Sequence, residues 1–178
     1  IIGKMLVTIQ LAVLVAVSVF VALVAASAVV HLIFRIPYVP SKRSSVHEMV
    51  KAAELKPCET VFDLGCGDGR LLIAAEKQTG VRAIGFEIAP LMFLMALIKK
   101  SLAHSKIQIN FKNFFSTDLS EADVIFCYLF PEAMEKLLEK IKNECKPGTR
   151  IISNTFKIQS MMPTRTMDTN PKIYVYRI

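Results

Sequence analysis

The chain has 178 residues, of which 53% are hydrophobic, and its formal net charge at pH 7 is +7. Its four cysteines form no C-x-x-C pair, which argues against a disulfide framework and a zinc site and predicts reduced thiols. The positive charge is compatible with nucleic acid, but a domain held beside anionic lipids explains it more simply.

An uncharged stretch at residues 5–30 consists almost wholly of Val, Ala, Leu, Ile and Phe. As a helix at ~1.5 Å per residue it would span about 39 Å, more than the ~30 Å hydrocarbon core of a bilayer. Ala26-Ser27-Ala28 resembles a cleavage site, but the stretch is longer than the apolar core of a usual signal peptide. A core helix of this length would outgrow the domain behind it. The sequence therefore predicts a transmembrane anchor at 1–34 and one domain at 35–178.

Positive charges flank this anchor unequally. Lys4 stands alone before it, whereas Arg35, Lys42, Arg43 and Lys51 follow it. Cytoplasmic flanks of membrane helices carry the excess of Lys and Arg. The sequence therefore predicts a single-pass membrane protein whose main domain lies on the cytoplasmic side. The chain does not begin with methionine, so further residues can precede it.

Beyond the anchor, the apolar patterns alternate between the periods of helices and strands. The predicted helices are 44–56, 70–78, Pro90–Ala103 and Glu132–Cys145. The predicted strands are Thr60–Leu64, Arg82–Glu87, Lys106–Phe111, Asp123–Leu129, Thr149–Phe156 and Lys172–Ile178. This alternation predicts an α/β fold, with a mainly parallel sheet and helices on both faces.

The first strand runs into V-F-D-L-G-C-G-D-G-R at 61–70, with three glycines at alternate positions before a helix. Such a turn brings a nucleotide-like ligand against bare backbone. The dinucleotide fingerprint is G-x-G-x-x-G, whereas this loop has Arg70 in place of the third glycine. The run resembles the first motif of Rossmann-like, class I S-adenosylmethionine-dependent methyltransferases, which implies S-adenosyl-L-methionine as the cofactor. The candidate cofactor residues in it are Asp63, Gly65, Cys66, Gly67 and Gly69.

Acidic and amide side chains at strand ends extend this candidate site. Glu87 ends the second strand, 18 positions after Gly69, where an acid can bind both ribose hydroxyls; the alternative is a solvated strand-end acid. Asp63 would organise the loop and the ligand's ammonium group rather than merely end a strand. Asn113 would bond the adenine amino group while Phe114 packs on the ring, or it is a turn asparagine beside core aromatics.

The fourth strand closes on Tyr128-Leu129-Phe130-Pro131, at the edge where ligands of such sheets lie. Tyr128, Phe130 and Pro131 are the candidates for the wall of the methyl-transfer site. Enzymes that methylate nucleobase amines usually carry Asn- or Asp-Pro-Pro-aromatic here. The only Pro-Cys pair, Pro57-Cys58, precedes the first strand, where it cannot serve cytosine-C5 methylation. No nucleic-acid substrate and no metal are expected.

Several features together resemble a family of small membrane-anchored methyltransferases. They are R-I-P-Y-V-P-S at 35–41 and the helix after it, D-L-G-C-G-D-G-R at 63–70, the strand end at Glu87, and Y-L-F-P-E at 128–132. Its eukaryotic members are mitochondrial protein-lysine N-methyltransferases of the ATP synthase c-subunit and the adenine nucleotide translocase, and it has prokaryotic relatives. The resemblance covers 35–178 and implies that Tyr38 and Ser41 lie over the cofactor.

Two segments depart from that family. The helix at 91–98, L-M-F-L-M-A-L-I, is far more apolar than a typical solvent-facing helix. We expect it to pack against neighbouring elements rather than to lean on lipid, because a helix apolar all round is usually buried. Residues 157–171 match no substrate loop that can be assigned.

The resemblance implies a protein-lysine N-methyltransferase that acts on a membrane or membrane-adjacent protein, with membrane lipid as a second partner. One alternative is a methyltransferase for a lipid or small amphipathic molecule, since the anchor holds the site near the bilayer in either case. Another is a degenerate cofactor-binding module, against which the intact glycine loop and Glu87 argue. A dry aromatic pocket near Tyr128 and Phe130 would favour a neutral lysine acceptor, and no strong general base is demanded.

Overall fold

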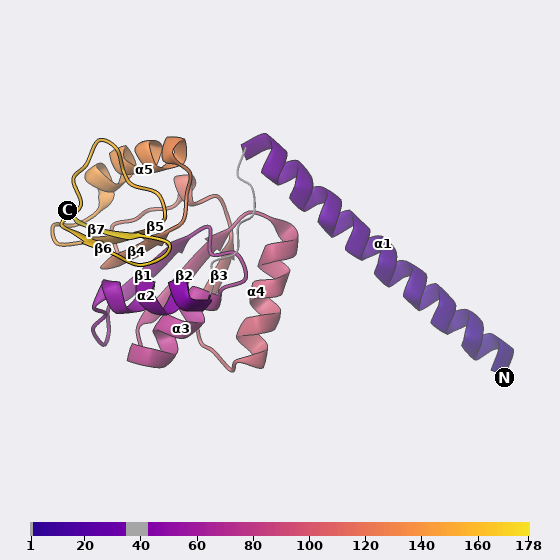
Figure 1. The fold of residues 1–178 in the computed structure, drawn as a ribbon. Coiled ribbons are helices and arrows are strands. Elements are labelled where there is room, and N and C mark those ends of the chain that lie inside the picture. Colours follow the sequence, from indigo (N-terminus) through magenta and orange to yellow (C-terminus); the bar gives the residue numbers. More distant parts are fainter. Residues whose placement is uncertain (1, 35–42) are drawn as a thin grey trace.

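The computed structural model describes residues 2–34 and 43–178 (Figure 1). The candidate cofactor residues Tyr38 and Ser41 lie outside the described residues. Figure 1 shows one long N-terminal helix, α1 (Ile2–Phe34), that leaves the side of an α/β domain and points away from it.

The domain is built on a seven-stranded sheet in the order β3-β2-β1-β4-β5-β7-β6. The strands are β1 (Thr60–Leu64), β2 (Arg82–Glu87), β3 (Gln108–Phe111), β4 (Val124–Cys127), β5 (Arg150–Asn154), β6 (Arg165–Met167) and β7 (Ile173–Arg177). β1 to β5 run parallel, and β7 is antiparallel to both β5 and β6. The strand order reverses between β1 and β4, which puts the topological switch point at their carboxyl ends. The predicted Rossmann-like fold is confirmed, with β6 as an additional strand.

Helices cover both faces of this sheet because successive side chains of each strand point to opposite faces. Val61 faces the layer of α2 (Arg43–Ala53) and α3 (Arg70–Thr79), and its neighbour Phe62 faces the layer of α5 (Pro131–Glu144). α4 (Pro90–Leu102) lies beside β3 at the border of the domain (Figure 1). A 3-10 helix, η1 (Phe114–Ser116), follows β3. The helix predicted at 44–56 ends earlier, because Glu54 adopts a left-handed φ of 49°.

The predicted apolar helix at the N-terminus is α1, and most of its side chains are exposed. Gly3–Val30 is long and apolar enough to cross a membrane by length and composition, and insertion stays a prediction. Among the described residues, the buried and half-buried positions of α1 lie in its C-terminal part, and α1 packs against α4. There the backbone N–H of Leu91 donates to Ser27 Oγ at 3.0 Å, and Ser27 is buried.

The apolar helix predicted at 91–98 is part of α4, and it is less buried than expected. Met92 and Ala96 are buried against the domain. Leu94, Leu97 and Ile98 are 37–50% exposed on the opposite side. The expectation that neighbouring elements cover this helix is therefore wrong for its outer face.

Gly85 in β2 lies where any side chain would collide with the loop after β1. A Cβ atom built at this position would come within 2.6 Å of Cys66 Sγ and 2.7 Å of Leu72 Cδ1. We predict that Gly85→Ala lowers the free energy of unfolding by about 1–3 kcal/mol, the usual effect of overpacking a core. Urea unfolding of the full chain in detergent measures this loss, and an unchanged midpoint would contradict it.

Candidate functional site

The loop at residues 65–69 follows β1 at the switch point of the sheet, and its conformation depends on glycine. Gly65, Gly67 and Gly69 have φ values of 85°, 55° and 74°, which side chains rarely permit. The backbone N–H groups of Gly65 and Cys66 donate to the carbonyl of Phe86 at 2.9 and 3.0 Å, so the loop is fastened to the end of β2. Gly69 then caps α3. The structure thus places bare backbone at a helix N-terminus, where the glycine spacing predicted it.

Glu87, the candidate ribose ligand, lies directly against this loop. Its Oε2 accepts from the N–H of Gly67 at 2.9 Å, and its Oε1 accepts from the N–H groups of Ile88 and Ala89 at 2.8 and 2.7 Å. A carboxylate offers about four acceptor directions. Three backbone donors therefore orient the buried carboxylate and leave a direction on Oε2 for a hydroxyl group of a ligand.

Asp63 is a buried carboxyl group that accepts no hydrogen bond from the described part of the chain. Burial, together with the nearby charges of Glu87 and Asp68, raises its pKa to about 8. A cation placed beside it would favour the ionised form and lower that pKa. Asp63, Glu87 and the bare glycine loop therefore fit a cofactor that carries an ammonium group and a ribose.

Asp68 received no role from the sequence, yet it clamps the loop to two helices. Its carboxylate accepts from Arg70 Nε at 2.8 Å and forms an ion pair with Arg70 at 2.6 Å. Lys99 of α4 forms a second ion pair with it. Burial alone would raise the pKa of Asp68, but the bonds from Arg70 and Lys99 hold it at about 2. The sequence around Asp68, a charged residue between two glycines, does not indicate that its partner Lys99 lies 31 positions away.

Asn113 and Phe114 follow the carboxyl end of β3, the edge strand of the sheet. Asn113 Oδ1 accepts from the N–H of Phe115 at 3.0 Å and so caps η1, the turn role that the sequence left open. Phe114 is buried in the core layer that also contains Leu64 and Phe86. The adenine contact assigned to Asn113 and Phe114 stays a prediction. An adenine amino group donates, so it would need the second acceptor direction of the same Oδ1 that caps η1.

Tyr128 and Phe130, the candidate wall after β4, lie against a third aromatic ring. Phe156 has its centroid 5.8 Å from that of Tyr128, in a stacked arrangement, and 5.0 Å from that of Phe130. Pro131 begins α5 directly behind them. These three rings, which we call the aromatic wall, are each only partly buried. They form an apolar surface at the carboxyl ends of β4 and β5.

A strained turn places Phe156, although the apolar pattern at 149–156 predicts it as the end of a strand. Thr155 has a φ of 67°, an outlier for a β-branched residue. The N–H of Phe156 bonds to the carbonyl of Asn154 at 2.7 Å, and Ser153 Oγ donates to the carbonyl of Phe156 at 2.6 Å. Such strain persists where the surroundings hold it, and it clusters at functional sites. No glycine marks this turn, so β5 was predicted two residues too long.

Cys66, Cys127 and Cys145 are buried, whereas Cys58 is exposed. Burial raises the pKa of the Cys66 thiol well above its usual value, that of Cys127 to about 12 and that of Cys145 to about 11. Buried, protonated thiols are poor nucleophiles. No group of three His, Cys, Asp or Glu residues in this range is placed to hold a metal ion.

Comparison with known proteins places this chain among methyltransferases. Residues 63–165 match the model of the ANTKMT methyltransferase domain. A protein-lysine N-methyltransferase of Saccharolobus islandicus is 36% identical and aligns with 80% of this chain and 94% of its own length. The adenine nucleotide translocase lysine N-methyltransferase of Mus musculus is 26% identical over 81% of this chain, which spans 64% of that protein.

A solved structure has the same fold. The RNA methyltransferase of Salinibacter ruber, in complex with S-adenosyl-L-homocysteine, superposes with a TM-score of 0.76 at 31% identity. The superposition covers 79% of this chain and 94% of that one.

The raised pKa of Asp63 predicts that binding of S-adenosyl-L-homocysteine depends on pH. In the free chain Asp63 is protonated below about pH 8. Contact with the ammonium group would ionise it, so binding releases a proton and the affinity rises with pH by up to about tenfold per unit. Isothermal titration at pH 6 and 7, in buffers of different ionisation enthalpy, measures both effects.

Asp63→Asn serves as the control for this titration. The amide cannot ionise, so the variant should bind more weakly and with no proton release. Equal proton release by the variant and the parent chain would exclude Asp63 as the group that titrates.

Proposed function

Because the chain belongs to the ANTKMT methyltransferase domain family, we propose that it methylates a lysine side chain of a protein in or beside a membrane. It is an S-adenosyl-L-methionine-dependent methyltransferase, as its family and its likeness to an S-adenosyl-L-homocysteine-bound methyltransferase establish. The lysine acceptor rests on the relatives from Saccharolobus islandicus and mouse, which are both named lysine N-methyltransferases. The aromatic wall is the structural observation that supports it.

The carboxyl ends of β1, β2 and β3 supply the residues that would hold the cofactor. Asp63 takes the ammonium group, the glycine loop packs against the amino-acid portion, and Glu87 binds the ribose. Asn113 and Phe114 would flank the adenine. The family resemblance implies that Tyr38 and Ser41, which lie outside the described residues, cover the cofactor. S-adenosyl-L-methionine supplies an electrophilic methyl group on a sulfonium centre. The buried acids suit it because the ligand carries positive charge.

The aromatic wall affects the protonation state of the acceptor amine. A lysine that reaches Tyr128, Phe130 and Phe156 leaves water, and desolvation lowers the pKa of an amine. The neutral amine is the nucleophilic form, so the wall favours transfer without a strong general base. The amine nitrogen gains positive charge as it takes the methyl group, so the ring faces would also stabilise the transition state.

α1 supports the placement of this activity at a membrane. Its apolar segment Gly3–Val30 has the length of a membrane span, and the excess of Lys and Arg follows it. By the positive-inside rule the catalytic domain then lies on the cytoplasmic side. A lipid or small amphipathic acceptor would use the same location, and it is the competing function. The Tyr128-Leu129-Phe130-Pro131 exit lacks the tetrad that holds nucleobase amines, which speaks against a nucleic-acid acceptor.

Radiolabelled S-adenosyl-L-methionine distinguishes the acceptors. The full chain in detergent is incubated with membranes of its source, and the products are extracted with organic solvent and digested with protease or nuclease. We expect the label to stay with protein and to appear as methyl-lysine after acid hydrolysis. Label that partitions wholly into solvent, or that nuclease releases, would contradict a protein-lysine acceptor. Asp63→Asn serves as the control for background incorporation.

The aromatic wall predicts a specific kinetic effect of Phe156→Leu. Leucine keeps the site apolar but removes a ring face that contacts the acceptor. We expect kcat/KM for the acceptor to fall about 5- to 30-fold, equivalent to ~1–2 kcal/mol of ring interaction. The affinity for S-adenosyl-L-homocysteine should not change, because Phe156 lies on the acceptor side. Weaker cofactor binding with unchanged acceptor kinetics would contradict this assignment.

A further inference from the structure

α4 exposes apolar side chains on the face where a helix of a soluble domain normally carries charge. Leu94, Leu97, Ile98 and Leu102 lie at helical spacing on its outer side, and Leu102 is 77% exposed. α5 shows the usual pattern in the same domain, since its exposed positions are mainly Glu and Lys. The four side chains on α4, here called the leucine face, are exposed apolar residues of one helix, and such a group marks an interaction surface.

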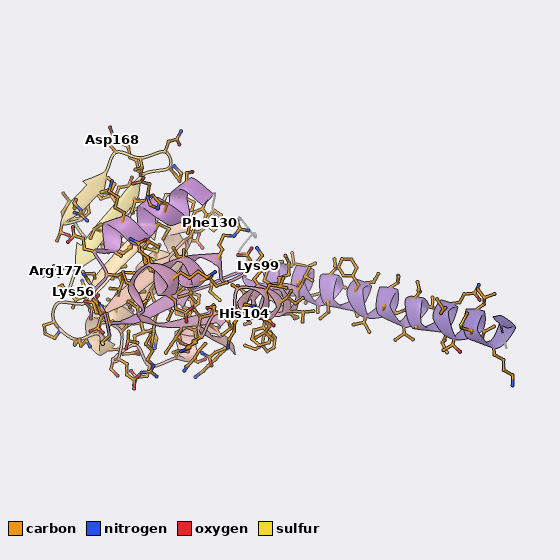
Figure 2. All side chains as sticks on the ribbon, turned by 90° about the horizontal axis from the view of Figure 1, so that it is seen from below. Lys56, Lys99, His104, Phe130, Asp168 and Arg177 are labelled. Atoms are coloured by element: carbon orange, nitrogen blue, oxygen red, sulfur yellow. The ribbon has the colours of Figure 1, made fainter. Side chains whose placement is uncertain are left out.

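The position of α1 identifies what this face meets. Figure 1 shows α4 at the border of the domain on the side toward which α1 extends. Figure 2, seen from below, shows α1 extending away from the side of the domain that carries Lys99 of α4 and His104. The bond between Ser27 and Leu91 fixes the start of α4 level with residue 27 of the apolar helix.

The length of α1 sets the depth of α4. About 20 helical residues cross the ~30 Å hydrocarbon core, so the 28-residue apolar segment exceeds a span by about 8 residues. Counted from the start of the segment at Gly3, a span of about 20 residues ends near residue 22, and Ser27 then lies beyond the hydrocarbon core. α4 therefore begins near the boundary between hydrocarbon and headgroups. In this position its leucine face is close to the surface of the bilayer.

The charges around the leucine face suit anionic headgroups. α4 contains no acidic residue, and Lys100 lies in its last turn. His104 and Lys106, which follow it, are exposed. Basic side chains around an apolar face are the usual pattern of a helix that lies in the membrane interface.

We propose that the leucine face of α4 lies in the surface of the lipid bilayer as a second contact beside the α1 anchor. This inference rests on the proposed membrane location. α4 also carries Lys99, which pairs with Asp68 of the cofactor loop. The membrane contact therefore holds the carboxyl edge of the sheet at a fixed orientation to the bilayer, within reach of acceptors at its surface.

The absence of tryptophan from the chain allows a direct test. Three single-tryptophan variants of the full chain are reconstituted in vesicles with and without dibrominated phosphatidylcholine, which quenches tryptophan on contact. Leu102→Trp reports the leucine face, and Phe20→Trp reports the anchor. Met162→Trp is the matched control, because Met162 is as exposed as Leu102 (78% against 77%) but precedes β6 at the opposite edge of the sheet.

We expect Leu102→Trp to emit at shorter wavelength and to be quenched nearly as strongly as Phe20→Trp, whereas Met162→Trp stays unquenched. Quenching of Phe20→Trp without quenching of Leu102→Trp would overturn the inference and leave the anchor intact. A blue-shifted but unquenched Leu102→Trp would likewise overturn it, in favour of a protein partner or a second copy of the chain. An unquenched Phe20→Trp would contradict the anchor itself.

Discussion

The hydrogen bond from the backbone N–H of Gly67 to the carboxylate of Glu87 joins the two strand ends on which the site depends. It needs a glycine in a left-handed conformation on one side and a buried acid on the other. The bonds from Gly65 and Cys66 to Phe86 keep the same two ends together. The loop packs directly on Gly85, so there is no room for a side chain at that position. The fold thus places bare backbone and carboxylates side by side at the carboxyl ends of β1 and β2. This arrangement suits a cationic ligand with a ribose.

Two buried acids at this site, Asp63 and Asp68, have opposite electrostatic surroundings. Among the described residues, the charges that act on Asp63 are those of two acids, and its raised pKa of about 8 keeps it protonated at neutral pH. A cation of a ligand would favour its ionised form. Asp68 is already paired with Arg70 and Lys99, so it holds the glycine loop to α3 and α4. Through Lys99 that pairing reaches α4, and through Leu91 and Ser27 α4 reaches α1. A short chain of contacts therefore connects the cofactor loop to the apolar helix that we propose as the membrane anchor.

The sequence predicted the strands, the helices and the glycine loop because these depend on local patterns: alternation, apolar periodicity and glycine spacing. It could not predict features that depend on partners distant in the chain or on strain. The Asp68–Lys99 pair joins residues 31 positions apart. The turn at Thr155 carries no glycine, so nothing in S-N-T-F announced that Phe156 would meet Tyr128 and Phe130. The apolar composition of α4 suggested burial, although the sheet covers only one of its faces.

A crystal structure of the full chain with S-adenosyl-L-homocysteine tests most directly that Asp63 and Glu87 hold the cofactor. We expect the ligand's ammonium group within hydrogen-bond distance of Asp63 and a ribose hydroxyl on Glu87 Oε2. The bonds from Ile88 and Ala89 to Glu87 should stay in place. A ligand whose ammonium group points to solvent, or whose ribose contacts neither acid, would contradict the account.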